Sequence, residues 1–125
     1  MAKTAVAYSK GVQQAPRKVS VVAALVRDRS VEDARVILQH TPRRTALAVL
    51  KTIESATANL LNSASIDTKT INIVRIVVSA GPRARRYMPA SRGRALPFEK
   101  KSSNILVEVI GQEKAKKVEA NKETK

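Results

Sequence analysis

Residues 71–110 read INIVRIVVSA, then GPRARRYMPASRGRALPFEKK, then SSNILVEVI. The first ten residues are rich in β-branched side chains, which favour a strand. In the last nine, Ile105, Val107 and Val109 alternate with polar residues, as in a half-buried strand. The link at 81–101 contains three prolines and two glycines, which argue against a helix. Two strands joined by such a link predict an extended antiparallel hairpin.

The link also concentrates the positive charge of the chain. It holds seven Lys and Arg residues against one carboxylate, Glu99, whereas residues 28–68 hold five charges of each sign. The whole chain has a formal net charge of +14. Such an excess predicts a nucleic-acid partner, and the five arginines suit phosphates of a folded nucleic acid. A solvated charged loop is the alternative, but Pro82, Pro89 and Pro97 stiffen this link and favour binding.

Aromatic residues are scarce, at 2% of the chain. Proteins that bind single strands stack bases on several aromatic side chains. The composition therefore favours recognition of shape and phosphates, in structured RNA or in DNA. We interpret Tyr8 as a packing residue, whereas Tyr87 and Phe98 lie in the basic link and suit either packing or stacking.

The region before residue 71 predicts a short strand at 4–9 and three helices. The first helix starts near Pro16, and its apolar stripe has the helical period: Val19, Val22, Ala23 and Val26. The second is capped by Ser30 with Asp33, and its apolar face is Val31, Ala34, Ile37 and Leu38. The third is long and is expected to start at Thr41-Pro42. Its stripe is Ala46, Leu50, Ile53, Thr57, Leu60, Leu61 and Ala64.

Catalytic chemistry is not indicated. The chain has no cysteine, and its single histidine, His40, lies at the end of the second predicted helix. No phosphate-binding loop, cofactor motif or metal site is recognisable, so we expect a protein that is not an enzyme. No stretch reaches the roughly 18 apolar residues of a membrane span, and the N-terminus lacks the apolar core of a signal peptide, so a cytoplasmic protein is expected. The length predicts one domain, residues 1–111, followed by a disordered tail at 112–125.

Three segments resemble a known family. They are PRKVSVVAALVRDRSVEDARVIL, TPRRTALAVLKTIESATAN and GPRARRYMPASRGRA, in this order. Together they are similar to bacterial large-subunit ribosomal protein twenty-two, of the universal L-twenty-two family. The resemblance implies an α+β fold, with three helices packed on a small three-stranded antiparallel sheet. It also implies a long protruding basic β-hairpin at about 79–104.

The function implied by the resemblance is that of a structural constituent of the large ribosomal subunit. The partners would be 23S rRNA, ribosomal protein four and the nascent peptide, for a monomer within the ribosome that has no cofactor and no membrane contact. The expected rRNA-binding residues are Lys10, Arg17, Lys18, Arg83, Arg85, Arg86, Arg92, Arg94, Lys100 and Lys101. The expected tip, which would line the peptide exit tunnel, is Tyr87, Met88, Pro89, Ala90, Ser91, Arg92, Gly93 and Arg94.

The chain departs from the family pattern at several positions. Family members usually have glycine at the position of Asp28, and they often have arginine at Ala90 and histidine at Asn104. Pro97 removes a backbone donor from the expected hairpin.

Two other classes of protein share part of this pattern. A histone-like architectural DNA-binding protein also uses basic β-arms, but it is typically a dimer. A membrane-active cationic protein would need a basic amphipathic helix. The predicted helices here are nearly neutral, which argues against that class.

Overall fold

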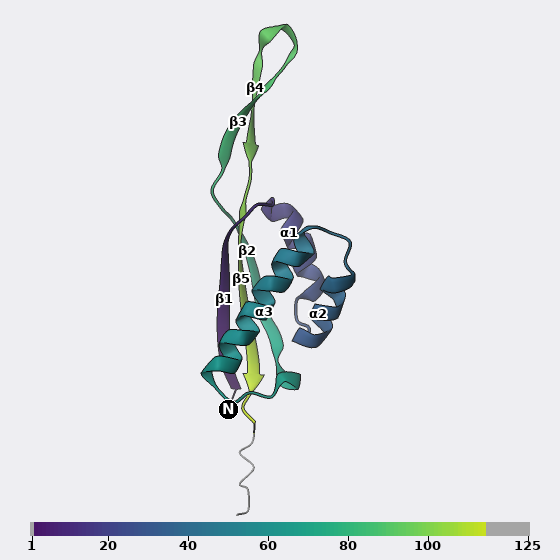
Figure 1. Ribbon diagram of the computed structural model, residues 1–125, viewed down its shortest axis with the longest axis vertical. Coiled ribbons are helices and arrows are strands. Elements are labelled where there is room, and N and C mark those ends of the chain that lie inside the picture. Colours follow the sequence, from purple (N-terminus) through teal and green to yellow (C-terminus); the bar gives the residue numbers. More distant parts are fainter. Residues whose placement is uncertain (1, 115–125) are drawn as a thin grey trace, which may run out of the picture.

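A computed structural model describes residues 2–114 and confirms the α+β class (Figure 1). The helices and strands follow in the order β1 (Ala2–Val12), α1 (Pro16–Val26), α2 (Val31–His40), α3 (Thr45–Ser63), the 3-10 turn η1 (Thr68–Thr70), β2 (Asn72–Ala80), β3 (Ala84–Pro89), the turn η2 (Ser91–Gly93), β4 (Ala95–Lys100) and β5 (Ser103–Gln112). They form a three-stranded sheet with its helices and a separate two-stranded sheet.

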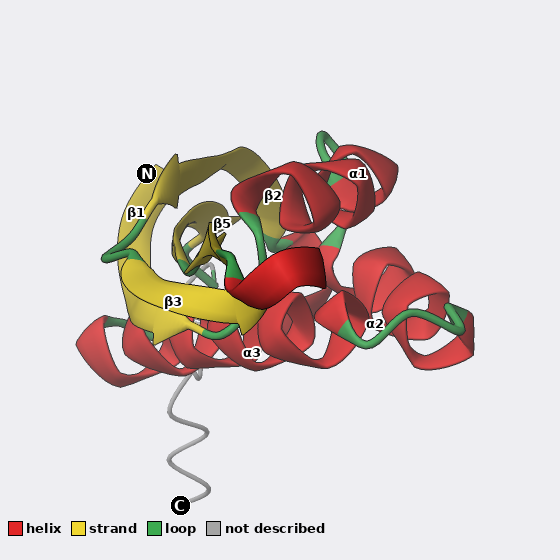
Figure 2. Ribbon diagram, turned by 90° about the horizontal axis from the view of Figure 1, so that it is seen from above, coloured by secondary structure: helices red, strands yellow, loops and turns green. Residues whose placement is uncertain are grey.

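The three-stranded sheet has the order β1-β5-β2, and β5 pairs antiparallel with both neighbours. The alternation read from the sequence is confirmed, because Ile105, Val107 and Val109 are buried. The helices lie along one side of this sheet (Figure 2). α3 packs on β1 and β5, α1 packs on β2, and α2 packs on the other two helices.

The first two helices follow the sequence pattern. All four residues of the predicted α1 stripe, Val19, Val22, Ala23 and Val26, are 0% exposed. α2 begins after Ser30, whose side-chain oxygen accepts a hydrogen bond from the Asp33 N–H at 3.3 Å. Asp33 and Glu32 also place negative charge in the first turn, where the helix dipole favours it. The predicted cap of this helix is therefore confirmed.

The predicted start of the third helix is wrong. α3 begins at Thr45, and Thr41 instead ends α2. The Thr41 hydroxyl donates to the Ile37 carbonyl at 2.6 Å, and its N–H donates to the Leu38 carbonyl at 3.4 Å. A residue before proline avoids helical dihedrals, and Thr41 has a ψ of 119°. Thr41 therefore donates hydrogen bonds to carbonyls at the end of α2 instead of capping the start of α3.

Strands β3 and β4 form a hairpin of their own within the basic link. They pair from Ala84↔Lys100 to Pro89↔Ala95, and the hairpin projects from one end of the body (Figure 1). The Gly81 N–H donates to the Ser102 carbonyl at 2.8 Å where the hairpin leaves the body. We call the segments around this contact, residues 80–83 and 100–102, the neck.

The prolines fit this hairpin because of its register. The Ala90 N–H donates to the Arg94 carbonyl at 2.7 Å. Hydrogen-bonded and non-hydrogen-bonded pairs alternate in an antiparallel ladder. Counted from the hydrogen-bonded pair Ala90 and Arg94, Pro89↔Ala95 is the first pair along the ladder and Tyr87↔Pro97 is the third. Both pairs are therefore of the non-hydrogen-bonded kind. Neither proline nitrogen is needed in the ladder, and β4 runs through Pro97 without a break.

The outer strands extend further than the sequence indicated. β1 covers Ala2–Val12 rather than 4–9, with a register shift between Ser9 and Val12. Gln112, which we expected in the tail, belongs to β5, and Glu113 pairs with Ile66. The order of the chain therefore continues past residue 111. The rest of the expected tail, 115–125, lies outside the described residues.

Candidate nucleic-acid interface

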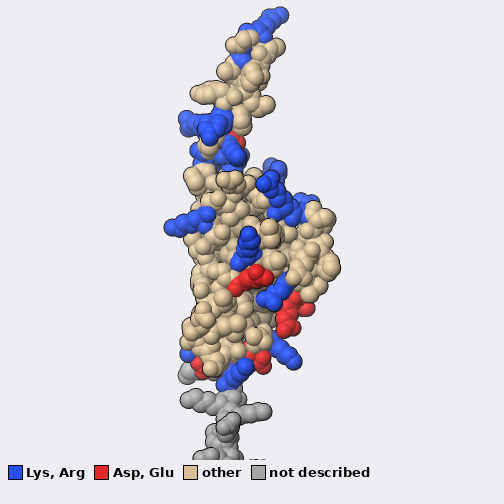
Figure 3. All heavy atoms as spheres, in the orientation of Figure 1, with Lys and Arg blue, Asp and Glu red and all other residues tan. Residues whose placement is uncertain are grey.

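The ten cations predicted to bind rRNA are all exposed in the structure. Lys and Arg side chains gather at the tip and at the base of the hairpin and on the adjoining end of the body (Figure 3). The fold brings three of the sequence segments together at the neck, where Arg17, Lys18, Arg83 and Lys101 line one hollow of about 320 Å³. It keeps Arg92 and Arg94 apart from this group, at the far end of the hairpin.

The hairpin has no core of its own. Every residue of β4 is exposed, and so is every residue of β3 except Ala84, which is half-buried. Tyr87 is 74% exposed and Phe98 is 41% exposed. These aromatic residues therefore do not pack against the body, and their surfaces are free for a partner.

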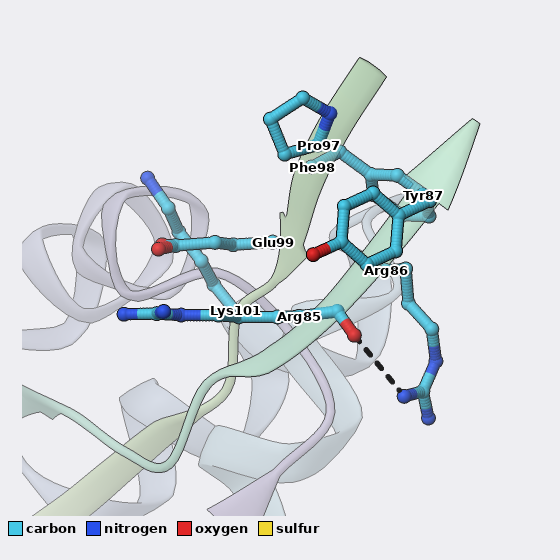
Figure 4. Close-up of a pocket in the computed structure, with 7 residues that line it drawn as sticks. All are labelled: Arg85, Arg86, Tyr87, Pro97, Phe98, Glu99 and Lys101. Atoms are coloured by element: carbon cyan, nitrogen blue, oxygen red, sulfur yellow. Dashed lines mark hydrogen bonds between the residues drawn. The ribbon is translucent and has the colours of Figure 1, made fainter. Parts of the chain in front are cut away.

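A hollow of about 640 Å³ lies along the hairpin (Figure 4). The side chains of Arg85, Glu99 and Lys101 extend to one side of the ribbon, and Arg86 points away from them. Arg86 donates to the Arg85 carbonyl at 3.3 Å. Tyr87 and Pro97 pair across the strands and lie next to these charges. Ring and guanidinium planes beside cations suit a nucleotide, because bases stack on such planes while cations neutralise phosphates.

Lys101 lies where several hollows of the basic surface meet. It lines four hollows, one along the hairpin, two beside the neck, and one between the starts of α1 and α3. Its place depends on Gly81, because a Cβ at residue 81 would lie 2.8 Å from Ser102 Oγ. The close approach of the two neck segments fixes where the basic hairpin meets the basic N-terminal region.

A further basic hollow was not predicted from the sequence. It has a volume of about 430 Å³, lies between the first turns of α1 and α3, and is called here the α1–α3 hollow. Its lining is Gln13, Gln14, Ala15, Lys18, Arg43, Arg44, Thr45 and Lys101.

Arg43 and Arg44 are the cations that sequence reasoning missed. Residues 28–68 have a net charge of zero, so a count by segment did not single out these two arginines. Three of the five carboxylates of that segment, Asp28, Glu32 and Asp33, lie around the start of α2 and not beside the arginines. The signal that could have identified them is two adjacent arginines before a helix with no acidic residue in its first turn.

The other predicted sites lie apart from the neck. Lys10 belongs to β1, and its Nζ lies 5.5 Å from the centroid of the Tyr8 ring. Tyr8 is 49% exposed, so our interpretation of it as a packing residue is wrong. It lies on the sheet face opposite the helices, because the preceding residue, Ala7, is buried and successive side chains of a strand point to opposite faces.

At the hairpin tip, Arg92 and Gly93 have φ values of +62° and +70°. Glycine adopts this left-handed backbone conformation without strain, whereas for arginine the conformation costs on the order of 1 kcal/mol. All tip residues from Tyr87 to Arg94 are exposed except Ala90, which is half-buried. The tight turn therefore presents two cations, Arg92 and Arg94, at the end of the ribbon.

Residues 2–114 contain no group of three or more His, Cys, Asp or Glu placed to hold a metal ion. Within the same range, no helix has both the length and the apolar character needed to cross a membrane.

Comparison with known proteins gives a consistent result. The model of the family described as ribosomal protein L22p/L17e matches residues 7–110. The large ribosomal subunit protein uL22 of Clostridioides difficile is 40% identical over 108 residues, which cover 86% of this chain and 96% of the relative. That of Clostridium tetani is 37% identical over 107 residues, with the same coverage. That of Heliobacterium modesticaldum is 38% identical over 121 residues, covering 97% of this chain and 86% of the relative.

Proposed function

The chain belongs to the ribosomal protein L22p/L17e family, and from this premise we propose that it binds 23S rRNA and lines the peptide exit tunnel with its hairpin tip. As a member of this family it is a structural, non-enzymatic constituent of the large ribosomal subunit, which in bacteria is cytoplasmic. The residues that make the contacts, and the partners they contact, are part of the proposal.

The observation that carries the proposal is a hairpin that is charged, projecting and without a core. A two-stranded hairpin alone is marginally stable in water. Seven cations against one carboxylate between residues 81 and 101 also repel one another. Phosphates that surround the ribbon would neutralise this charge and release counterions, which favours binding. The same cations, with Lys10, Arg17 and Lys18 on the body, form the proposed rRNA-binding surface.

The length of the hairpin suits a reach into the subunit. Eleven residues separate Gly81 in the neck from Arg92 at the tip. At roughly 3.3 Å per residue, the tip lies about 36 Å from the neck. In the proposal the flanks of the ribbon contact rRNA, and the tip from Tyr87 to Arg94 faces the nascent peptide near ribosomal protein four. Residues 1–111 act as one domain, a monomer in the subunit, with the hairpin at about 79–104.

The architectural DNA-binding alternative is less well supported. The feature that favoured this alternative is the basic β-arm, and rRNA binding explains that arm equally well. The family match over residues 7–110 includes both the helical body and the hairpin, and the relatives reported above are named for the ribosome.

The test is association with the subunit and with its RNA. We expect the endogenous protein to sediment with large subunits and to remain there in moderate salt. The purified chain should bind a 23S rRNA transcript more tightly than a 16S rRNA transcript, and log Kd should rise linearly with log salt. Free protein at the top of the gradient, or equal binding to both transcripts without salt dependence, would overturn the proposal.

A further inference from the structure

We propose that the α1–α3 hollow is a phosphate site that takes one backbone phosphate of the folded rRNA. The inference rests on the proposed rRNA binding and adds a specific subsite to it. It assigns a role to Arg43, Arg44 and Thr45, which the sequence did not single out. The site lies on the body, next to the neck, and is separate from the arm of the hairpin.

Two helix N-termini open onto the hollow. Ala15 and Arg44 precede α1 and α3, and neither helix has a side-chain cap or an acidic residue in its first turn. α2 differs, with Ser30 as its cap and two acidic residues in its first turn. The N-terminal turn of a helix carries a partial positive charge that favours an anion, and free N–H groups add to it, although Pro16 in α1 has none. α1 and α3 begin at the same end of the body, where the hairpin projects (Figure 1).

Four cations from three distant segments line the same space. They are Lys18, Arg43, Arg44 and Lys101, and no carboxylate is among the lining residues. None of the four makes an ion pair with another residue of the range 2–114. Like charges repel when they are gathered without a counter-charge. A phosphate in the hollow would supply that counter-charge.

Thr45 gives an independent indication of a missing partner. It is 5% exposed, and its hydroxyl has no hydrogen-bond partner in the described part of the chain. The other buried threonines of α3 differ, because Thr52 and Thr57 each donate to the carbonyl four residues earlier, at 2.9 Å. At Thr45 that position is Thr41, which lies before the helix. An unpaired buried hydroxyl destabilises the free protein, and a phosphate oxygen would accept from it.

A second unpaired polar atom lies in the lining. The side-chain oxygen of Gln14 is also buried and lacks a hydrogen-bond partner among residues 2–114. The amide of Gln14 carries two N–H donors beside this oxygen, so the side chain can turn a donor towards an anion. Within the described range, the hollow therefore combines two uncapped helix starts, four cations without an ion pair and two buried polar atoms without a hydrogen bond.

The first experiment measures binding of the full chain to a 23S rRNA transcript across a salt series. The test variant is Arg43→Gln/Arg44→Gln, and the matched control is Lys69→Gln/Lys114→Gln, which removes the same charge away from the hollow. We expect the test variant to bind about 10- to 100-fold more weakly, with a log–log salt slope smaller by about one. The control should change Kd by less than about threefold and leave the slope unchanged.

The second variant separates a ligand-binding role from a structural one. Thr45→Val removes the hydroxyl and keeps the shape of the side chain. We expect Tm to rise, because an unpaired buried polar group is lost, while rRNA binding weakens about 3- to 10-fold. A fall in Tm, or a rise in Tm with unchanged rRNA binding, would contradict the role of Thr45 in the site.

The third measurement uses inorganic phosphate as the probe. Titration of the wild-type protein should shift the amide resonances at the starts of α1 and α3, and the double arginine variant should lose these shifts. If phosphate binds there but the test variant binds rRNA as its control does, the hollow is a free-anion site and the inference is overturned while the proposed function stands. Failure of the wild-type chain to bind 23S rRNA would overturn the proposed function as well.

Discussion

Arg83 and Glu99 form an ion pair across the foot of the hairpin, with 3.5 Å between Nη1 and Oε2. Glu99 is the single carboxylate among residues 81–101 and therefore the one group there that offsets the cations. Exposed pairs of this kind stabilise a fold by about 0–1 kcal/mol. The pair therefore matters more for the charge of the hairpin than for its stability.

The first prediction is that Glu99→Gln strengthens rRNA binding and leaves stability nearly unchanged. The free energy of unfolding, from urea titration, should change by less than about 0.5 kcal/mol. Affinity for a 23S rRNA transcript should rise, because the repulsion between the carboxylate and phosphates is removed. Glu54→Gln is the control, since Glu54 pairs with Arg35 at 3.8 Å on the body. Weaker binding by Glu99→Gln would show instead that Glu99 orients Arg83 for contact.

The second prediction concerns Asp28, which follows the last residues of α1 with a φ of +61°. Glycine adopts this conformation without strain and is common after a helix, whereas other residues are strained there. The carboxylate makes no ion pair with any residue of 2–114. Asp28→Gly should therefore raise the free energy of unfolding by about 0.5–1 kcal/mol.

The control for Asp28→Gly is Asp33→Gly, in the first turn of α2, where the dihedrals are helical. Glycine there should lower the free energy of unfolding by about 1 kcal/mol. Chemical denaturation of both variants measures the two effects. Destabilisation by Asp28→Gly would mean that the aspartate side chain stabilises the end of α1 by more than the backbone strain costs.

Much of the body could be predicted from the sequence because it depends on local periodicity. The α1 stripe and the alternation in β5 are set by neighbours within a few residues, and burial follows directly. Thr41 shows the limit of such patterns. A threonine before a proline is typical of a helix start. Thr41 instead donates hydrogen bonds to the carbonyls of Ile37 and Leu38 and so lies at the end of α2.

The basic surface was predicted only in part, because its assembly is a matter of tertiary structure. Lys18, Arg43 and Lys101 come from three segments that no local pattern connects, and α1, α3 and the neck bring them together. Within the link, Pro89 and Pro97 left no local strand pattern, and only the family resemblance implied a hairpin there. Only the register shows that both occupy non-hydrogen-bonded positions.

The third prediction concerns Gly111, whose backbone passes close to the core. A Cβ there would lie 2.5 Å from Ile66 Cγ2 and 3.0 Å from Leu60 Cδ2. Gly111→Ala should lower the free energy of unfolding by about 1–3 kcal/mol through overpacking. In a double-mutant cycle with Ile66→Ala, which removes the nearer methyl group, the two costs should be less than additive. Additive costs would show that the contacts with Leu60 and Ile71, rather than the contact with Ile66, are responsible.

The last prediction tests the tip and is designed from the register. Arg86↔Phe98 lies two pairs beyond Met88↔Leu96 and four beyond the hydrogen-bonded 90–94 pair, so it is of the hydrogen-bonded kind. A two-residue Asn-Gly turn fits such a pair. Replacing residues 87–97 by Asn-Gly should therefore remove the tip and keep a short, correctly paired hairpin with Arg83, Arg85, Arg86, Lys100 and Lys101.

We expect this shortened protein to fold and to enter large subunits, because the body, the neck and the α1–α3 hollow are intact. What should change is the tunnel: a photo-cross-linking nascent chain, paused on ribosomes that carry the shortened protein, should lose its cross-links to this chain. Ala90→Arg serves as the control, since it adds a cation to an intact tip and should leave incorporation unchanged. If the shortened protein fails to enter subunits, the tip is needed for assembly. If it enters and the cross-links persist unchanged, the tip does not line the tunnel and that part of the proposed function is wrong.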